Sequence, residues 1–352
     1  MTRARASHLS RRRLATAITV GLVVVIAALV VCPLIGAGPG GDLGLLDVGD
    51  LVRGASGEPT AAWRLYTFAR LPRAVAACVV GAGLAAAGCA LQSMLRNPLA
   101  EPYTLGISSG AALFAVLAIR LGADRVLGSG AIDSAAFIGA AAASFAVWQL
   151  GRVGRNLPPA TLLLAGVTVA MFCAAASMLV LYTSDFAEVY RIVGWMMGGL
   201  DYTLWPALVE SAVPIAVSLV ALLWVARDLN ALAAGADAAA SVGVIAQRAM
   251  AIAFVASAII VGASVSLAGA VGFVGLIVPH AARAVVGPDH RVMLPVSILA
   301  GGAFLVIADT LGRVALAPRE LPVGIVTALM GGPFFLYVLY REKSRGRMWG
   351  AM

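Results

Sequence analysis

Long apolar runs separated by short polar stretches dominate the chain. A helix needs about 20 apolar residues to cross a hydrocarbon core of about 30 Å. Several runs are shorter than that, so we expect tilted or broken helices among them. Gly272, Gly275 and Pro279 interrupt one such run, which makes it the weakest of the set. The pattern predicts ten transmembrane helices, at residues 14–35, 72–95, 105–121, 134–150, 159–182, 206–226, 248–268, 271–286, 292–308 and 323–340.

Composition agrees with this pattern. Of the 352 residues, 61% are hydrophobic and 12% are charged, and the mean hydropathy is +0.95, whereas soluble domains are about 45–50% apolar and about 25% charged. The run at 14–35 is longer than the apolar core of a signal peptide, so we expect a retained first helix. The sequence predicts an all-α polytopic membrane protein with a tail at 1–13, one transmembrane domain at 14–340 and a tail at 341–352.

Basic residues are distributed unevenly between the predicted loops. With ten helices both termini lie on one side, and that side carries 16 of the 25 Lys and Arg residues and 6 of the 17 acidic residues. Loops that stay in the cytoplasm carry the excess of Lys and Arg. We therefore expect a protein of the inner, cytoplasmic membrane with both termini in the cytoplasm. The net charge of +8 then indicates topology and contact with membrane lipid, not nucleic-acid binding.

The segment 228–248 differs from its apolar neighbours. It is rich in alanine and flanked by polar residues, with Gly235 at its centre and Gly243 near its end. A glycine inside a helical pattern marks a turn or a close backbone approach. The pattern predicts two short helices on either side of Gly235, lying at the cytoplasmic membrane surface. An ordinary connecting loop is the alternative.

Residues that would support catalysis or cofactor binding do not form recognisable motifs. The single lysine, Lys343, stands in the C-terminal tail, so the chain has no P-loop of the form G-x-x-x-x-G-K-[ST]. No cluster of histidines or cysteines has metal-ligand spacing, and the four cysteines lie singly in apolar runs. We expect neither an enzyme nor a bound cofactor or metal. Charged residues at mid-span are almost absent, which disfavours an ion-coupled carrier.

Several ordered motifs resemble one family of transport proteins. They are R-L-P-R at 70–73, A-L-Q-S-M-L-R-N-P-L-A-E-P at 90–102, L-G-I-S-S-G-A at 105–111, G-F-V-G-L-I-V-P-H-A-A-R at 272–283, D-H-R at 289–291 and E-L-P-V-G-I-V-T-A-L-M-G-G-P-F-F at 320–335. Together they look like the FecCD-type permease subunit of ABC importers for iron-siderophores, haem or cobalamin. The likeness covers nearly the whole chain from about Leu65.

The resemblance implies a type II ABC importer permease architecture. It implies a homo- or heterodimer of ten-helix subunits, two cytoplasmic ATP-binding subunits, and an extracytoplasmic substrate-binding protein. The family's coupling segment, L-G-x-x-x-A-x-x-L-G-V, is similar to residues 234–244, with Ala234 and Val242 in place of the two leucines. Such a surface helix could lie in a groove of the ATPase and transmit its movement. The predicted coupling residues are Gly235, Asp237, Ala239 and Gly243.

Two further sets of residues are candidates for transport. Met-rich and glycine-rich segments suit a wide, weakly binding path, because thioethers adapt to irregular shapes; core packing at the dimer interface is the alternative for the Met-Met pair. The path candidates are Trp195, Met196, Met197, Gly198, Leu329, Met330 and Gly331. Arg70, Arg73 and Arg313 are expected on the outward side, where the resemblance implies that they meet acidic residues of the binding protein. Anchoring to lipid headgroups is the alternative.

The function that follows is the permease of an ATP-driven importer for a metal chelate. The family resemblance makes a ferric siderophore the leading substrate, with haem, cobalamin and molybdate as alternatives. An ion-coupled secondary carrier ranks second and a membrane-embedded enzyme third. Co-purification of an ATPase would separate the first two hypotheses.

Overall fold

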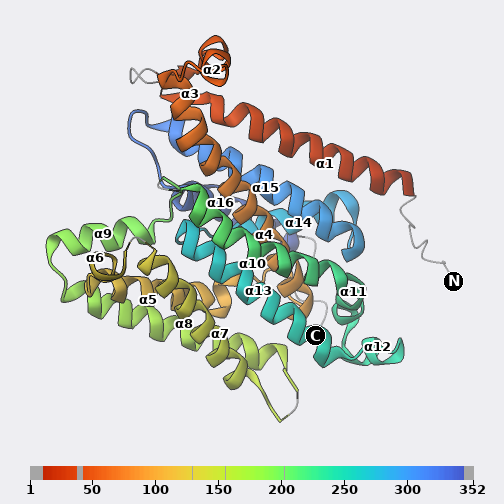
Figure 1. The fold of residues 1–352 in the computed structure, drawn as a ribbon. Coiled ribbons are helices and arrows are strands. Elements are labelled where there is room, and N and C mark those ends of the chain that lie inside the picture. Colours follow the sequence, from red (N-terminus) through yellow and green to blue (C-terminus); the bar gives the residue numbers. More distant parts are fainter. Residues whose placement is uncertain (1–10, 38–42, 129, 155, 202, 345–352) are drawn as a thin grey trace.

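The computed structural model describes residues 11–37, 43–128, 130–154, 156–201 and 203–344. Most of the two predicted tails, at 1–13 and 341–352, lies outside these residues. Within them the chain forms a bundle of long helices with short helices at both ends (Figure 1). The ten apolar helices are α1 (Arg11–Val31), α4 (Leu71–Met94), α5 (Ile107–Arg120), α7 (Ala131–Gly151), α8 (Pro159–Tyr182), α10 (Trp205–Trp224), α13 (Ala246–Ala268), α14 (Val274–Val286), α15 (His290–Ala315) and α16 (Val323–Ser344).

These ten helices confirm the ten predicted runs. Eight of them are long and apolar enough to cross a membrane. The other two, α5 and α14, have 14 and 13 residues, or about 20 Å at 1.5 Å per residue, so neither spans a 30 Å core alone. The prediction for α15 was too short: the helix runs to Ala315 instead of 308, which places Asp309 and Arg313 inside it.

Short elements connect the long helices. A two-stranded antiparallel hairpin pairs Ile35 with Leu45 and Ala37 with Leu43. The strands are β1 (Ile35–Ala37) and β2 (Leu43–Leu45), the short helices are α2 (Val48–Ala55), α3 (Ala61–Leu65), α6 (Ala123–Leu127), α9 (Phe186–Met196), α11 (Ala226–Ala234) and α12 (Ala236–Ser241), and the remaining helical turns are η1 (Cys32–Leu34), η2 (Tyr66–Arg70) and η3 (Pro102–Leu105).

Helix α4 is the centre of the bundle. Of its most apolar window, 83% is buried, against 22% for α1 and α8, and it packs against α10, α13, α14 and α15. Small residues allow this close packing: a Cβ added at Gly81 would lie 2.2 Å from the carbonyl oxygen of Gly301 in α15. Such contacts drive helix association in a bilayer, where lipid is as apolar as the side chains.

The two ends of the bundle differ. Helices α11 and α12 lie at one end, and α2, α3, α6 and α9 lie at the other (Figure 1). The two short helices predicted around Gly235 are confirmed, and Gly235 separates them with φ +118°. A side chain is strained in that backbone region, which explains a glycine at this turn.

Candidate functional site

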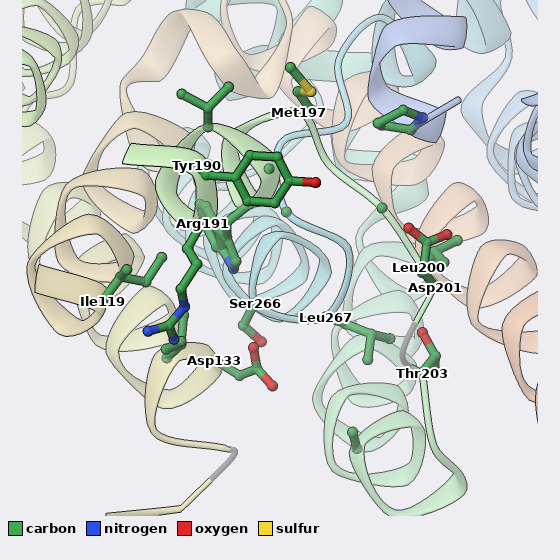
Figure 2. A pocket seen from close by; sticks show the side chains of 18 of the residues that line it. Ile119, Asp133, Tyr190, Arg191, Met197, Leu200, Asp201, Thr203, Ser266 and Leu267 are labelled. Carbon is green, nitrogen blue, oxygen red and sulfur yellow. The ribbon is translucent and has the colours of Figure 1, made fainter. Parts of the chain in front are cut away.

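A cavity of about 860 Å³ lies beneath α9, and we call it the α9 cavity. This volume is near the upper end of the range for small-molecule pockets, about 300–1,000 Å³. Its walls come from α5, α7, α9, α10 and the end of α13, together with the segment that follows α9. Figure 2 shows Met197 at one edge and Thr203 and Asp201 across from Arg191.

Polar groups in the α9 cavity are few and lie on two sides. Asp133, Ser266, Tyr190 and Arg191 lie on one side, and Asp201 and Thr203 lie on the other (Figure 2). Most of the remaining lining is apolar, including Ile119, Ile132, Phe186, Val189, Leu200 and Leu267. Such a surface can contact a bulky amphiphilic molecule over a large area without holding it at many polar points.

Next to this cavity, three backbone segments meet directly. Gly198, with φ +70°, could not carry a side chain, because its Cβ would lie 2.3 Å from the carbonyl oxygen of Ala270. A Cβ at Gly324 would lie 2.3 Å from the carbonyl oxygen of Met197 and 2.4 Å from that of Ala270. The Gly324 amide also donates to the carbonyl of Gly198 at 3.3 Å. The ends of α9 and α13 and the start of α16 are therefore joined through main chain, and we call this contact the glycine junction.

Beyond the glycine junction the chain turns sharply at Phe273. This residue has φ +68°, a conformation that is unusual without glycine, and its amide donates to the carboxylate of Glu101. Its ring fills the space beside Gly331, where an added Cβ would lie 2.2 Å from the ring. Residues that hold a strained conformation cluster at functional sites, and Phe273 places α14 against α16.

The predicted path residues separate into four groups. Trp195 and Met197 line the α9 cavity, whereas Met196 packs against Val116, Ile119 and Ile192. Gly198 belongs to the glycine junction, and Gly331 contacts Phe273. Leu329 and Met330 are exposed on α16, 66% and 40%, and do not line the cavity. Their role in a path between two subunits stays a prediction.

Arg73 lies at the centre of an ion-pair network that is buried at Asp309 and half-exposed at Asp201 and Glu320. Its guanidinium contacts Asp309 at 2.9 Å, Asp201 at 2.8 Å and Glu320 at 2.5 Å. Asp309 is 3% exposed and also contacts Arg313 at 3.3 Å. The network joins α4 to α15 and to the segments that follow α9 and α15.

Arg70 and Arg313 complete this network from the side of the hairpin. Arg70 donates to the carbonyls of Pro33, Leu34 and Ala37, and its shortest hydrogen bond, to Ala37, is 2.6 Å long. Arg313 donates to the carbonyls of Cys32 and Ile35 at 3.0 and 3.1 Å. The two arginines therefore hold the segment after α1 against α15.

All three arginines are buried, which docking to a partner does not predict. Arg70, Arg73 and Arg313 are 6%, 7% and 5% exposed, and each guanidinium contacts carboxylates or carbonyls inside the chain. A buried charge needs such partners, since leaving it unpaired costs several kcal/mol. Docking of a binding protein at these residues stays a prediction, but it would require them to give up these contacts.

The coupling residues also divide by exposure. Asp237 and Gly243 are exposed, whereas Gly235 is buried and Ala239 is 0% exposed. The Ala239 methyl group faces the chain's own interior in this arrangement, and contact of the four coupling residues with an ATPase stays a prediction. Two apolar side chains that sequence reasoning did not select are exposed instead, Val242 at 68% and Ile245 at 67%.

Helix α11 is anchored to the bundle by a chain of polar contacts. The Asn230 amide nitrogen donates to Asp289 at 2.8 Å, and its oxygen accepts from the backbone and the ring Nδ1 of His290 at 2.8 and 2.7 Å. The other ring nitrogen of His290 contacts the Ser93 hydroxyl in α4. Hydrogen bonds from Arg291 hold the pKa of Asp289 well below its usual range. The segment is thus tied to both α15 and the central helix.

Sequence reasoning missed Asp201, Glu320 and Asn230. The charge count gave a signal for Asp201 and Glu320. The predicted outward loops hold 11 acidic and 9 basic residues, and such nearly equal numbers favour ion pairs between acidic and basic side chains. Nothing in the pattern indicated Asn230, because its partners are about 60 residues away. Among the residues the structure describes, no group of three or more His, Cys, Asp or Glu side chains could hold a metal ion.

A bundle of ten apolar helices with a large cavity, and short helices at both ends, defines a polytopic membrane transport protein. The model of the FecCD transport family matches residues 22–341. The chain therefore belongs to the FecCD transport family, which confirms the resemblance found in its motifs.

Similar proteins agree with this assignment. The chain is 46% identical over 290 residues to the cobalamin import system permease protein BtuC of Halobacterium salinarum, covering 82% of this chain and 77% of that protein. It is 40% identical over 288 residues to the hemin transport system permease protein HmuU of Yersinia pestis, covering 81% and 86%. A solved structure of a metal-chelate type ABC transporter in an inward-facing conformation matches with a TM-score of 0.81 and 28% identity, covering 93% and 99%.

These findings establish the general class of the chain. It has the fold of an ABC importer permease and is the permease subunit of an importer for a metal chelate, haem or cobalamin. It is accordingly a transport subunit and not itself an enzyme.

Proposed function

We propose that this chain carries a bulky metal chelate across the cytoplasmic membrane, driven by ATP that separate subunits hydrolyse. The α9 cavity supports this best, because about 860 Å³ of mostly apolar space with few polar groups suits a large amphiphilic cargo. Weak, distributed contacts let a cargo leave as readily as it enters.

For the cargo itself we consider two classes. A corrinoid or porphyrin chelate, cobalamin or haem, is favoured by the relatives that resemble the chain at 46% and 40% identity. A ferric siderophore, the substrate expected from the family resemblance, is the second candidate class. Both classes are bulky metal chelates, and the two differ in shape and in the number of polar groups that they present.

The orientation that we propose places both termini, α11 and α12 in the cytoplasm, as the distribution of Lys and Arg indicates. The exposed face formed by Asp237, Val242, Gly243 and Ile245 then meets an ATP-binding subunit. The apolar side chains of this face lie in the turn between α12 and α13, and an exposed apolar patch of this kind can lie in a partner groove. Gly235 and Ala239 shape that face from within.

At the opposite end of the bundle, an extracytoplasmic binding protein delivers the cargo to the α9 cavity. The half-exposed carboxylates Asp201 and Glu320, which are 43% and 44% exposed at their side chains, lie beside the arginines predicted to dock it. A second permease subunit completes the transport unit. The exposed face of α16 then lines the transport path between the two subunits.

Uptake into reconstituted vesicles tests this function. The permease is reconstituted with its ATP-binding subunits and loaded binding protein, and uptake of cobalamin, haem and a ferric siderophore is measured with and without ATP. ATP-dependent uptake of one chelate class identifies the cargo. Uptake that needs an ion gradient and no ATP would contradict the proposal and favour a secondary carrier.

A further inference from the structure

A second, smaller groove lies on the side of the bundle between α7 and α13. Its volume is about 380 Å³, and its walls include Phe137, Phe145, Trp148 and Phe254. The rings of Trp148 and Phe254 lie 5.2 Å apart at an angle of 45°. Phe145 is 65% exposed, so the groove opens outward and not into the α9 cavity.

The shape of this groove follows from the residues at its two ends. At one end Gly262 lets the helices approach, since an added Cβ would lie 3.1 Å from the Cβ of Ala140. At the other end the large rings of Trp148 and Phe254 line the space between the helices. The one hydroxyl in the wall, from Ser144, donates to the Ala140 carbonyl at 2.7 Å. The groove therefore offers almost entirely apolar contacts, which suit a hydrocarbon chain.

Two exposed arginines lie beyond the end of the groove that Trp148 and Phe254 line. Arg152 follows the last residue of α7, one helical turn from Trp148, and Arg248 lies in the first turn of α13. The two sites are at the same end of the bundle, because Gln247 donates to Asn156 at 3.4 Å. Within the described part of the chain, neither guanidinium pairs with a carboxylate, and that of Arg248 lies 5.5 Å over the Trp224 ring.

We infer that the groove binds one acyl chain of an anionic phospholipid whose phosphate lies at Arg152 and Arg248. Both helices are long enough to cross the membrane, so the groove between them lies at the depth of the hydrocarbon core. The inference rests on the orientation proposed above, which places the arginines at the cytoplasmic leaflet, where anionic lipids concentrate. Arginine is also the side chain that binds phosphate in a bidentate manner.

Fluorescence quenching by brominated lipids tests this site. The purified permease in detergent micelles is titrated with brominated phosphatidylglycerol or brominated phosphatidylcholine. The difference between the wild type and Trp148→Phe isolates the signal of Trp148. We expect half-maximal quenching of Trp148 at a lower concentration of phosphatidylglycerol, by on the order of five-fold for each arginine that contacts the phosphate.

Variants separate the headgroup from the acyl chain. Arg152→Gln with Arg248→Gln should abolish the preference for phosphatidylglycerol while quenching by both lipids persists. Arg227→Gln is the matched control. Arg227 is another exposed arginine, in the first turn of α11, and its variant should keep the preference for phosphatidylglycerol. Ala258→Phe, which fills the groove, should weaken quenching by both lipids.

Three results would overturn the inference. Equal quenching by the two lipids in the wild type, or a preference that survives in the double glutamine variant, would mean unspecific contact with surrounding lipid. Protection of Trp148 from both lipids would mean that a second copy of the chain covers the groove. None of these results depends on which chelate is transported, so failure of this site and failure of the proposed function are distinguishable.

Discussion

Arg73 in α4 and Asp309 in α15 form an ion pair inside the helix bundle, with Nε to Oδ1 and Nη2 to Oδ1 both 2.9 Å long. Because the side chains are 8% and 3% exposed, either charge left alone would be poorly solvated. The pair fixes the central helix to α15 close to the α9 cavity.

Removing one partner of this pair should destabilise the protein strongly. We expect Asp309→Ala to lower the free energy of unfolding by about 3–5 kcal/mol, the cost of an uncompensated buried charge. Thermal unfolding in detergent measures it. Arg53→Ala is the control, since Arg53 is largely exposed and 3.9 Å from Asp50, and it should change stability by no more than about 1 kcal/mol. Equal melting temperatures for the two variants would contradict the buried role of Asp309.

Charge reversal at Arg70 and Arg73 distinguishes a structural role from docking. If the two arginines mainly stabilise the fold through contacts within the chain, Arg70→Glu with Arg73→Glu should reduce the amount of folded permease in the membrane. Fluorescence-detected size exclusion of the solubilised protein measures that amount. A normally folded double variant with weaker, less salt-dependent affinity for the binding protein would instead support docking through these residues.

Polar substitutions at the exposed apolar face should weaken the ATPase interaction. Val242→Asp with Ile245→Asp replaces two side chains that are about two-thirds exposed, so the permease should still fold. We expect co-purification of the ATP-binding subunit to fall by about ten-fold, corresponding to 1.4 kcal/mol. Val52→Asp, equally exposed on α2, provides the control at the other end of the bundle. Unchanged co-purification would place the ATPase elsewhere.

Loss of the Asn230 side chain should uncouple α11 from the bundle. Asn230→Ala removes partners of Asp289 and His290, at a cost of about 1–3 kcal/mol for the groups left unpaired. We expect the ATP-binding subunit still to bind, but fewer chelate molecules to be transported per ATP hydrolysed. The ratio of uptake to phosphate release in vesicles measures this. A normal ratio would show that Asn230 contributes only to folding.

Neighbouring methionines should differ in their access to water. In a variant without native cysteines, Met197→Cys should react with a polar thiol reagent, because Met197 lines the α9 cavity. Met196→Cys should react at least ten-fold more slowly, because Met196 packs against Val116 and Ile192. Reagent added from outside intact vesicles also tests the proposed orientation. Equal rates would remove the distinction between cavity and core.

Much of the fold was predictable because each long helix is a nearly continuous apolar run. Helix α8 begins and ends where the run at 159–182 does, and Gly235 divides the coupling segment as expected. The site was less predictable, because its contacts join residues far apart in the chain. Arg73 meets Asp309 across 236 positions, and an arginine near a helix end has the same local pattern whether it faces water or a buried carboxylate.

The glycine junction also limits how this protein can diversify. Where the backbones of Gly198, Ala270 and Gly324 touch, no side chain lies between them that mutation could enlarge or shrink. The cavity wall is different, since residues such as Ile132, Val189 and Ala207 project into open space. New cargo preferences can therefore arise by substitutions on the wall of the α9 cavity, while the glycine junction beside it stays the same for every cargo.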